Sequence, residues 1–317
     1  MEKRSLGTSD IKITPIIMGT WQAGKKAWVG IEDAQSIEAI RAAFDSGITT
    51  IDTAEVYGKG HSEGIVAQAL SDVRDQVVYA TKVFANHLKY DQVLKACERS
   101  LKNLNTDYID LYQIHWPSGS FNSEIVPIEE TMSALNQLKQ QGKIRAIGVS
   151  NFSRAQLTEA AQYGRIDSLQ PPYSLFWRWV EKDEMPYCIE NNISILAYSP
   201  LAQGLLTGKF ATGHKFDPAD IRAKNKLFQG ENYLRAQQAL NKLRPIAERY
   251  QTSLASLAIA WLIAQPQTNA IVGARNPEQA TANAKAAVQL SPDDIQEIDT
   301  IGRIVTDHLD DNPVMWN

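Results

Sequence analysis

The regular alternation of short apolar segments with amphipathic segments constrains the fold of this chain more than any other feature. Between the apolar runs, apolar residues recur at helical spacing, for example over residues 93–104 and 128–138, which predicts helices that cover one side of a sheet. The short runs are rich in apolar or β-branched residues and predict strands at residues 16–18, 49–51, 77–79, 108–112, 144–149, 168–170, 193–197 and 270–272.

Strand–helix units repeated along 317 residues predict an α/β fold, a closed parallel (β/α)8 TIM barrel, because every crossover helix then packs on the same outer face. An open doubly wound sheet is the alternative. Residues 4–13 predict an N-terminal β-hairpin that plugs the bottom of the barrel. The glycine-rich residues 202–232 predict a long loop after strand seven that serves as a lid. We expect a single barrel domain over residues 1–317, with a C-terminal tail that can return over the barrel mouth.

The amino-acid composition limits the kinds of molecule that the protein is expected to bind. Thirty-two basic and 36 acidic residues give a net charge of −4, so the chain lacks the positive field that nucleic acid or an anionic membrane requires. No segment approaches the ~20 apolar residues of a membrane span, and the N-terminal segment lacks the apolar run of a secretion signal. The only cysteines, Cys97 and Cys188, are far apart and fit a reducing compartment. We expect a cytoplasmic protein with a small-molecule substrate; the sequence leaves its oligomeric state open.

Polar residues stand where the predicted strands end. In a TIM barrel, active sites form at the carboxyl ends of the strands, so these positions are the candidates for chemistry. Tyr57 follows the second strand at a distance of five residues. The polar residues at the strand ends are Asp52, Lys82, His115, Ser150, Asn151, Gln170, Tyr198 and Ser199. An aspartate, a tyrosine, a lysine and a histidine around one barrel mouth predict a proton-transfer site.

The reduction of a carbonyl group explains this residue set, because a hydride reaches the carbon while the oxygen must acquire a proton. A phenol has a pKa of about 10, and we expect the ammonium of Lys82 to lower the pKa of Tyr57 so that it serves as general acid and base. Asp52 is expected to keep Lys82 charged, and His115 to donate a hydrogen bond to the substrate oxygen. Each residue alone has a structural alternative: a solvated ion pair, a structural histidine or a loop-capping tyrosine. Their placement on different strands at one end of the barrel favours catalysis.

The same segments resemble the aldo-keto reductase family, and the resemblance covers nearly the whole chain. Within that family, the chain is similar to a bacterial branch of general-purpose or inositol-cluster-associated reductases with IPGAR-type motifs before the last helix. The segments that carry the resemblance are residues 47–58, 80–82, 101–115, 142–152 (GKIRAIGVSNF), 169–174 and 196–201.

The resemblance implies that the cofactor NADP(H) lies extended across the barrel, without a Rossmann domain. Ser150, Asn151 and Gln170, at the ends of strands five and six, match residues that bind the carboxamide of the nicotinamide. Tyr198 matches the aromatic residue that stacks under the nicotinamide ring. The phosphates are expected at residues 199–209 and 273–283, where Arg275 offers paired hydrogen bonds to a 2′-phosphate. The expected cofactor contacts are Gly19, Thr20, Trp21, Asp52, Ser150, Asn151, Gln170, Tyr198, Ser199, Pro200, Leu201, Gly204, Leu205, Lys209, Gly273, Arg275, Gln279 and Asn283.

The sequence departs from some family members at the adenosine end. Gly273-Ala274 and Gln279 replace a Lys-Ser pair and an arginine, and Ala282 replaces the glutamate that usually precedes Asn283. The expected substrate pocket consists of Trp21, Tyr57, Phe84, His115 and Trp116, with Tyr173 and Trp316 as further aromatic candidates.

The sequence therefore predicts an NADP(H)-dependent oxidoreductase that interconverts aldehydes or ketones and alcohols, without a metal. A cofactor-binding regulatory or sensor protein similar to potassium-channel β subunits is the alternative, because such proteins share the fold and turn over slowly. An unrelated barrel hydrolase would need a metal cluster or a carboxylate pair, and no compact set of such residues occurs in the sequence.

Overall fold

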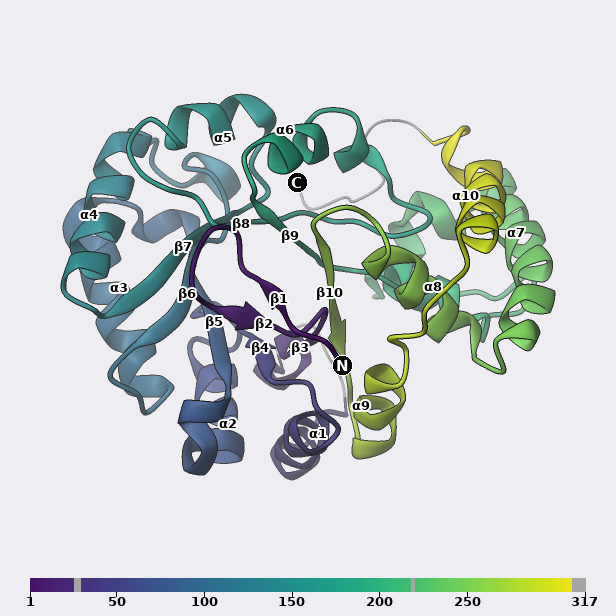
Figure 1. Ribbon diagram of the computed structural model, residues 1–317, viewed down its shortest axis with the longest axis horizontal. Coiled ribbons are helices and arrows are strands. Elements are labelled where there is room, and N and C mark those ends of the chain that lie inside the picture. Colours follow the sequence, from purple (N-terminus) through teal and green to yellow (C-terminus); the bar gives the residue numbers. More distant parts are fainter. Residues whose placement is uncertain (26–29, 218–219, 310–317) are drawn as a thin grey trace.

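A closed barrel of parallel strands forms the centre of the computed structural model, which describes residues 1–25, 30–217 and 220–309 (Figure 1). Around the barrel the strands follow the order β10-β3-β4-β5-β6-β7-β8-β9. Their bounds are β3 (Ile16–Gly19), β4 (Thr50–Asp52), β5 (Val78–Val83), β6 (Ile109–Ile114), β7 (Ile144–Ser150), β8 (Ser168–Gln170), β9 (Ser194–Ala197) and β10 (Thr268–Gly273). Each apolar run found in the sequence overlaps one of these strands, which confirms the predicted (β/α)8 TIM barrel.

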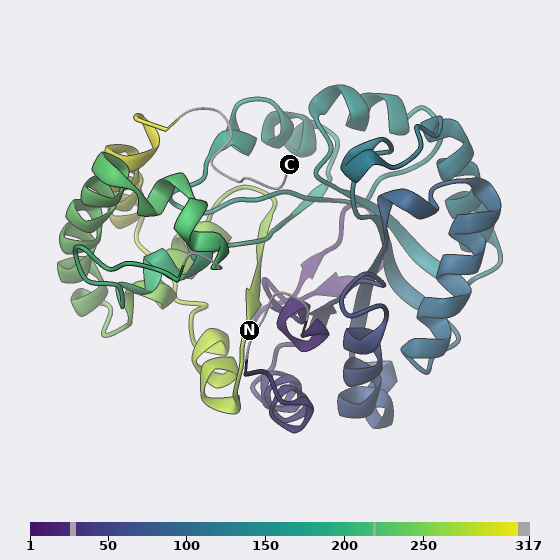
Figure 2. The same cartoon turned by 180° about the vertical axis from the view of Figure 1, so that it is seen from behind.

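Helices surround the barrel, as both views show (Figures 1 and 2). The two predicted apolar stripes lie in α3 and α4, and their buried residues face the barrel strands. None of the described helices is long and apolar enough to cross a membrane. The helix bounds are α1 (Asp33–Asp45), α2 (His61–Leu70), α3 (Tyr90–Asn103), α4 (Ile128–Gln140), α5 (Arg154–Ala160), α6 (Glu184–Glu190), α7 (Gly230–Arg249), α8 (Leu254–Ile263), α9 (Pro277–Ala284) and α10 (Pro292–Thr306).

The predicted hairpin closes the amino end of the barrel. Strand β1 (Arg4–Ser5) pairs antiparallel with β2 (Lys12–Ile13), and Leu6 packs in one apolar cluster with inward-facing barrel residues such as Leu111. The backbone N–H of Gly7 donates to Oγ of Ser194, the first residue of β9, at 2.9 Å. The guanidinium of Arg4 donates to the carbonyl of Thr268 at 2.7 Å. The hairpin therefore lies at the bottom, as predicted.

The long loop after β9, the seventh strand of the barrel, is also present. It contains the short 3₁₀ helices η6 (Ala202–Thr207), η7 (Ile221–Lys224) and η8 (Lys226–Phe228). Phe216 packs on Phe210 and Phe228, with ring centroids 5.1 and 4.9 Å apart, so the loop has an apolar core of its own. Its function as a lid stays a prediction. The tail with Trp316 lies outside the described residues.

Candidate active site

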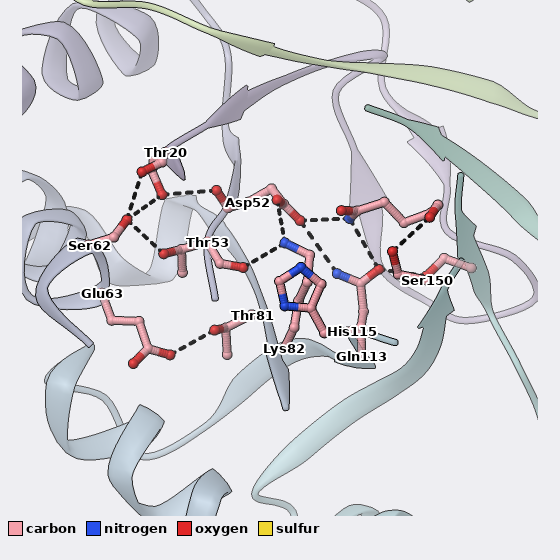
Figure 3. A network of polar contacts seen from close by, with 12 residues as sticks. Thr20, Asp52, Thr53, Ser62, Glu63, Thr81, Lys82, Gln113, His115 and Ser150 are labelled. Atoms are coloured by element: carbon pink, nitrogen blue, oxygen red, sulfur yellow. Dashed lines mark hydrogen bonds and ion pairs between the residues drawn. The ribbon is translucent and has the colours of Figure 1, made fainter. Parts of the chain in front are cut away.

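The polar residues singled out at the strand ends meet at the carboxyl end of the barrel (Figure 3). Asp52, Ser150 and Gln170 are the last residues of β4, β7 and β8, and Lys82 is the next-to-last residue of β5. His115 directly follows β6. Parallel register aligns these ends, since Ser150 pairs with Gln170 and Asp52 pairs with Ala80 of β5. The fold therefore brings together side chains that are far apart in the sequence.

Asp52 and Lys82 form a buried ion pair. Lys82 has no exposed surface, and its Nζ donates to Oδ1 of Asp52 at 2.6 Å and to the carbonyl of Thr53 at 2.8 Å. The second carboxylate oxygen of Asp52 accepts from the side-chain amides of Gln170 at 2.8 Å and Gln113 at 3.4 Å. A solvated ion pair at the rim is therefore excluded. Gln113 was not singled out in the sequence, because an amide within an apolar strand gives no distinctive signal.

The electrostatics of Tyr57 differ from the expectation. The charges around Tyr57 are those of Lys82 and Asp52. Burial lowers the pKa of Lys82, whereas the carboxylate of Asp52 raises it, and this effect of Asp52 is the one that was predicted. Nζ of Lys82 lies 5.1 Å from the centroid of the Tyr57 ring. Burial and the negative charge of Asp52 raise the pKa of Tyr57 well above its usual value of about 10, so the predicted lowering is wrong. The physical reason is that Asp52 offsets the ammonium charge while the phenol loses its hydration. Tyr57 is therefore protonated at neutral pH, which is the form that a general acid needs.

His115 lies between two aromatic rings. Its ring contacts those of Tyr57 and Phe84 edge to face, with centroids 5.6 Å away in both cases. Burial and the nearby positive charge of Lys82 lower the pKa of His115 well below its usual value, so the imidazole is neutral. Its Nδ1 is buried and has no hydrogen-bond partner within the described part of the chain. A neutral imidazole in this position can donate one hydrogen bond to a bound molecule.

An aromatic wall stands beside His115. Phe84 contacts Phe121, whose ring contacts that of Trp116, with centroids 5.4 and 5.1 Å apart. Trp21 lies on the other side, 6.5 Å from the Tyr57 ring. The sequence analysis missed Phe121, because a single aromatic residue in a loop carries no pattern.

Tyr173 does not belong to this wall, so that expectation is wrong. Its side chain is fully buried, its hydroxyl donates to Glu181 at 2.7 Å, and its ring packs on Trp261. The hydroxyl is engaged in a structural contact, so this tyrosine stabilises the packing of the barrel against its outer elements.

The residues expected to bind the nicotinamide form one chain of hydrogen bonds. The hydroxyl of Tyr198 donates to Oδ1 of Asn151 at 2.9 Å, and Nδ2 of Asn151 donates to the carbonyl of His115 and to Oγ of Ser150, both at 3.0 Å. Oγ of Ser150 donates to the carbonyl of Gln170 at 2.7 Å. Tyr198 is partly exposed. This part of the rim therefore offers an ordered set of amides next to an aromatic ring.

Comparison with known proteins gives the family. The model of the aldo/keto reductase family matches residues 15–303. The chain belongs to the aldo/keto reductase family. The reductase is 41% identical over 314 residues to the aldo-keto reductase YhdN of Bacillus subtilis (strain 168), covering 95% of this chain and 93% of that protein. It is 38% identical over 308 residues to the NADH-specific methylglyoxal reductase of Escherichia coli (strain K12), covering 90% and 93% of the two chains.

Solved structures agree with this assignment. The glycerol dehydrogenase AKR11B4 from Gluconobacter oxydans superposes with a TM-score of 0.88 at 33% identity, covering 99% of the reductase and 98% of that chain. An aldo/keto reductase from Klebsiella pneumoniae in complex with NADP and acetate gives a TM-score of 0.73 at 32% identity, covering 92% of both chains. The reductase is thus an oxidoreductase of this family, as the motifs led us to expect.

In the loop between β10 and α9, where the sequence analysis expected the adenosine, two of the expected contact residues hold the backbone. Oε1 of Gln279 accepts from the backbone N–H of Arg275 at 2.9 Å, and Nδ2 of Asn283 donates to the carbonyl of Gly273 at 3.2 Å. A Cβ on Gly273 would lie 2.3 Å from Nε2 of Gln22, so only glycine fits there without displacing that side chain.

Basic side chains of the long loop after β9 act on one another and on Arg275. Lys209 and Arg222 both lie over the ring of Phe210, with Nζ and Cζ 4.9 and 5.4 Å from its centroid. Desolvation and the positive charges of Arg222 and Arg275 lower the pKa of Lys209. Arg222 forms a two-pronged contact with Asp220, with its Nε 2.9 Å from Oδ1. The sequence analysis predicted Lys209 and Arg275 but missed Arg222, because its position depends on how the long loop folds.

The remaining residues that were expected to contact the cofactor differ in their hydrogen bonds and in their exposure to solvent. Oγ1 of Thr20 lies 3.0 Å from the carbonyl of Asp52 and 2.8 Å from Oγ of Ser62, so this hydroxyl supports the strand ends. Gly19 ends β3, and Trp21 is partly exposed. Pro200 and Leu205 are buried, whereas Ser199, Leu201 and Gly204 are partly exposed. Within the described residues, no group of three or more His, Cys, Asp or Glu side chains is placed to hold a metal ion.

Proposed function

We propose that Asp52, Tyr57, Lys82 and His115 are the catalytic residues with which this reductase interconverts aldehydes or ketones and alcohols. The observation that carries the proposal is the position of the Tyr57 ring, which lies 5.1 Å from the buried ammonium of Lys82 and 5.6 Å from the neutral ring of His115. This arrangement places a protonated acid and a hydrogen-bond donor beside each other at a partly exposed surface.

In the reductive direction, Tyr57 gives its hydroxyl proton to the carbonyl oxygen, and His115 donates a hydrogen bond to that oxygen as negative charge develops. The bound nicotinamide supplies the hydride that the carbonyl carbon accepts. Lys82 stabilises the phenolate that remains on Tyr57, and Asp52 holds the ammonium in place through the 2.6 Å contact. Alcohol oxidation uses the same groups in reverse, with the phenolate of Tyr57 accepting the alcohol proton.

The chemistry of the rim fits a nicotinamide cofactor. The partly exposed ring of Tyr198 can stack on a planar ring, and Ser150, Asn151 and Gln170 offer amide and hydroxyl groups suited to a carboxamide. We propose that Lys209 and Arg275 hold phosphate groups, because an anion there would offset the burial and the positive charges of Arg222 and Arg275 that together lower the pKa of Lys209.

We propose NADP(H) over NAD(H), a location in the cytoplasm, and membership of the bacterial general-purpose or inositol-cluster-associated branch. The cytoplasmic location is supported by Cys97 and Cys188, which are buried free thiols. Branch membership rests on the segment before the last helix.

Substitution Arg275→Ala tests the cofactor preference. Because a guanidinium can meet a 2′-phosphate with paired hydrogen bonds that bare ribose cannot reciprocate, we expect NADPH binding to weaken by about 1 to 3 kcal/mol while NADH binding barely changes. Cofactor titration by fluorescence measures both. Arg249→Ala is the matched control, since Arg249 forms ion pairs with Asp294 and Glu297 at the surface between α7 and α10. Equal losses for both cofactors, or no loss for NADPH, would show that Arg275 does not bind the 2′-phosphate.

The proposed activity is tested by following NADPH oxidation at ~340 nm over a panel of aldehydes and ketones. We expect turnover with several small carbonyl compounds and none without a carbonyl substrate. A regulatory or sensor protein similar to potassium-channel β subunits would instead bind NADPH tightly but turn over far below the ~1 s⁻¹ that marks the low end of typical enzymes.

A further inference from the structure

A second buried carboxylate lies at the rim, outside the residues assigned so far. Glu55 stands two positions before Tyr57 and is 9% exposed. Its Oε1 accepts from the backbone N–H of Phe84 at 2.9 Å and lies 2.9 Å from Nδ1 of His87. Its Oε2 accepts from Nη2 of Arg99 at 2.9 Å. Both carboxylate oxygens are therefore held by partners from outside their own loop.

These contacts join three separate segments of the fold. Glu55 belongs to the loop after β4, which also carries Tyr57; Phe84 and His87 belong to the loop after β5, around the 3₁₀ helix η3 (Ala85–His87); and Arg99 belongs to α3. The backbone N–H of Glu55 also donates to the carbonyl of Lys82 at 3.3 Å. One residue thus fixes the loop of the proposed acid relative to the ends of the neighbouring strand and its loop.

Phe84 is the part of this junction that faces the site. Its ring stands nearly perpendicular to the His115 ring, at 84°, and it supports the ring of Phe121, which is 52% exposed. Because the N–H of Phe84 is held by Glu55, a shift of this backbone moves the aromatic wall relative to His115. A substituent on the carbonyl carbon would rest against that wall.

We propose that Glu55 is a positioning residue. It sets the distance from the part of the aromatic wall formed by Phe84 and Phe121 to the rings of Tyr57 and His115, and it thereby favours carbonyl substrates that carry a bulky apolar group. The proposal rests on the proposed function of the site. It assigns no contact with substrate to Glu55, which acts through the backbone of Phe84 and through its own loop.

The barrel offers a matched control at its opposite end. Asp110 is a buried carboxylate near the start of β6, and it also accepts from one backbone N–H, that of Tyr79 at 2.9 Å, and from two cationic side chains. These are Arg74 at 2.9 Å and Arg145 at 2.7 Å. The amino end of a TIM barrel serves stability, so the same chemistry there is remote from the site.

The test compares Glu55→Gln with Asp110→Asn, which each remove one buried charge at nearly constant volume. We expect both variants to melt at lower temperature, because Glu55→Gln leaves Arg99 without its carboxylate and Asp110→Asn does the same to Arg74 and Arg145. Only Glu55→Gln is expected to raise KM for benzaldehyde, by roughly tenfold, with a smaller change for propanal, since misplacement of a wall by a fraction of an ångström weakens contacts with the larger group. The Kd for NADPH is expected to stay within about twofold of wild type in both.

A second readout does not depend on turnover. The ring protons of His115 lie in the field of the Phe84 ring, so their NMR chemical shifts report the position of the wall. We expect these signals to move in Glu55→Gln and to stay in place in Asp110→Asn. Arg99→Met, at a half-exposed side chain, removes one donor and is expected to move them in the same direction by less.

The outcomes separate this inference from the proposed function. If wild-type protein reduces no carbonyl compound, the proposed function fails, while the His115 signals still test the positioning. If those signals remain at their wild-type positions in both Glu55→Gln and Arg99→Met, or if Asp110→Asn changes the benzaldehyde KM as much as Glu55→Gln does, the positioning role of Glu55 is wrong.

Discussion

Replacement of Tyr57 by phenylalanine is expected to abolish carbonyl reduction, a loss on the order of 10²- to 10⁴-fold or more in kcat, because it removes the hydroxyl of the ring that lies close to both Lys82 and His115. NADPH affinity should stay within a few-fold of wild type, since the phenol is not assigned to cofactor binding. Steady-state rates together with cofactor titration measure the two effects. Retained reduction by Tyr57→Phe would remove Tyr57 from its role as acid.

The raised pKa of Tyr57 adds a pH signature to this prediction. Reduction requires the protonated phenol, and a pKa above about 10 keeps that form populated throughout the neutral range, so Tyr57 contributes no loss of reduction rate between pH 7 and about 10. Alcohol oxidation requires the phenolate, so its rate should rise with pH across the same interval. Rates measured against pH in both directions check that the pKa of Tyr57 is raised. A reduction rate that falls steadily above pH 7 because Tyr57 loses its proton would contradict it.

Lys82→Met is expected to leave the reductase nearly inactive and clearly less stable. The variant removes the positive charge beside the Tyr57 ring and leaves the buried carboxylate of Asp52 with the amides of Gln113 and Gln170 as its side-chain donors among the described residues. Loss of one partner of a buried ion pair costs about 3 to 5 kcal/mol, which a denaturant titration detects.

Two control variants separate stability from catalysis at this pair. Asp52→Asn should keep the fold and lose rate, with an altered pH profile because Lys82 is no longer held as a cation. Asp52→Asn combined with Lys82→Met removes both charges and should recover part of the lost stability without recovering activity. Wild-type rates and pH profiles in the single variants would show that the pair has no part in the reaction.

Much of the fold could be predicted because the signals for it are local. Each barrel strand has its own apolar run, and α10 begins after a local signal of the same kind, Ser291, whose side chain caps the helix by accepting from the backbone N–H of Asp294. The rim residues followed from the same signals, since a residue that ends a parallel strand must lie at the carboxyl end of the barrel. Asp52 and Gln170 illustrate this: they are 118 positions apart and yet form a 2.8 Å hydrogen bond.

Apart from Gln113, which lies within a strand, the missed features depend on how deeply a group is buried or on the conformation of a loop, and strand signals contain neither. The sequence shows that Lys82 and Asp52 end neighbouring strands, but the sign of the shift in the pKa of Tyr57 depends on how completely the site is buried. Arg222 and Phe121 lie in loops whose course is set by contacts with distant residues. Glu55 was overlooked because its partners belong to other segments and only the folded barrel brings them within 2.9 Å.

The hairpin at the bottom of the barrel has a consequence for the order of folding during synthesis. The guanidinium of Arg4 is bonded to residues 259 and 264 positions later in the chain, and β3 finds its second neighbour only in β10. Closure must therefore wait until nearly the whole polypeptide has left the ribosome, because its first and last segments complete each other. Until then the apolar inward side of the early strands lacks its final partners, and unpaired strand edges of this kind are prone to aggregate.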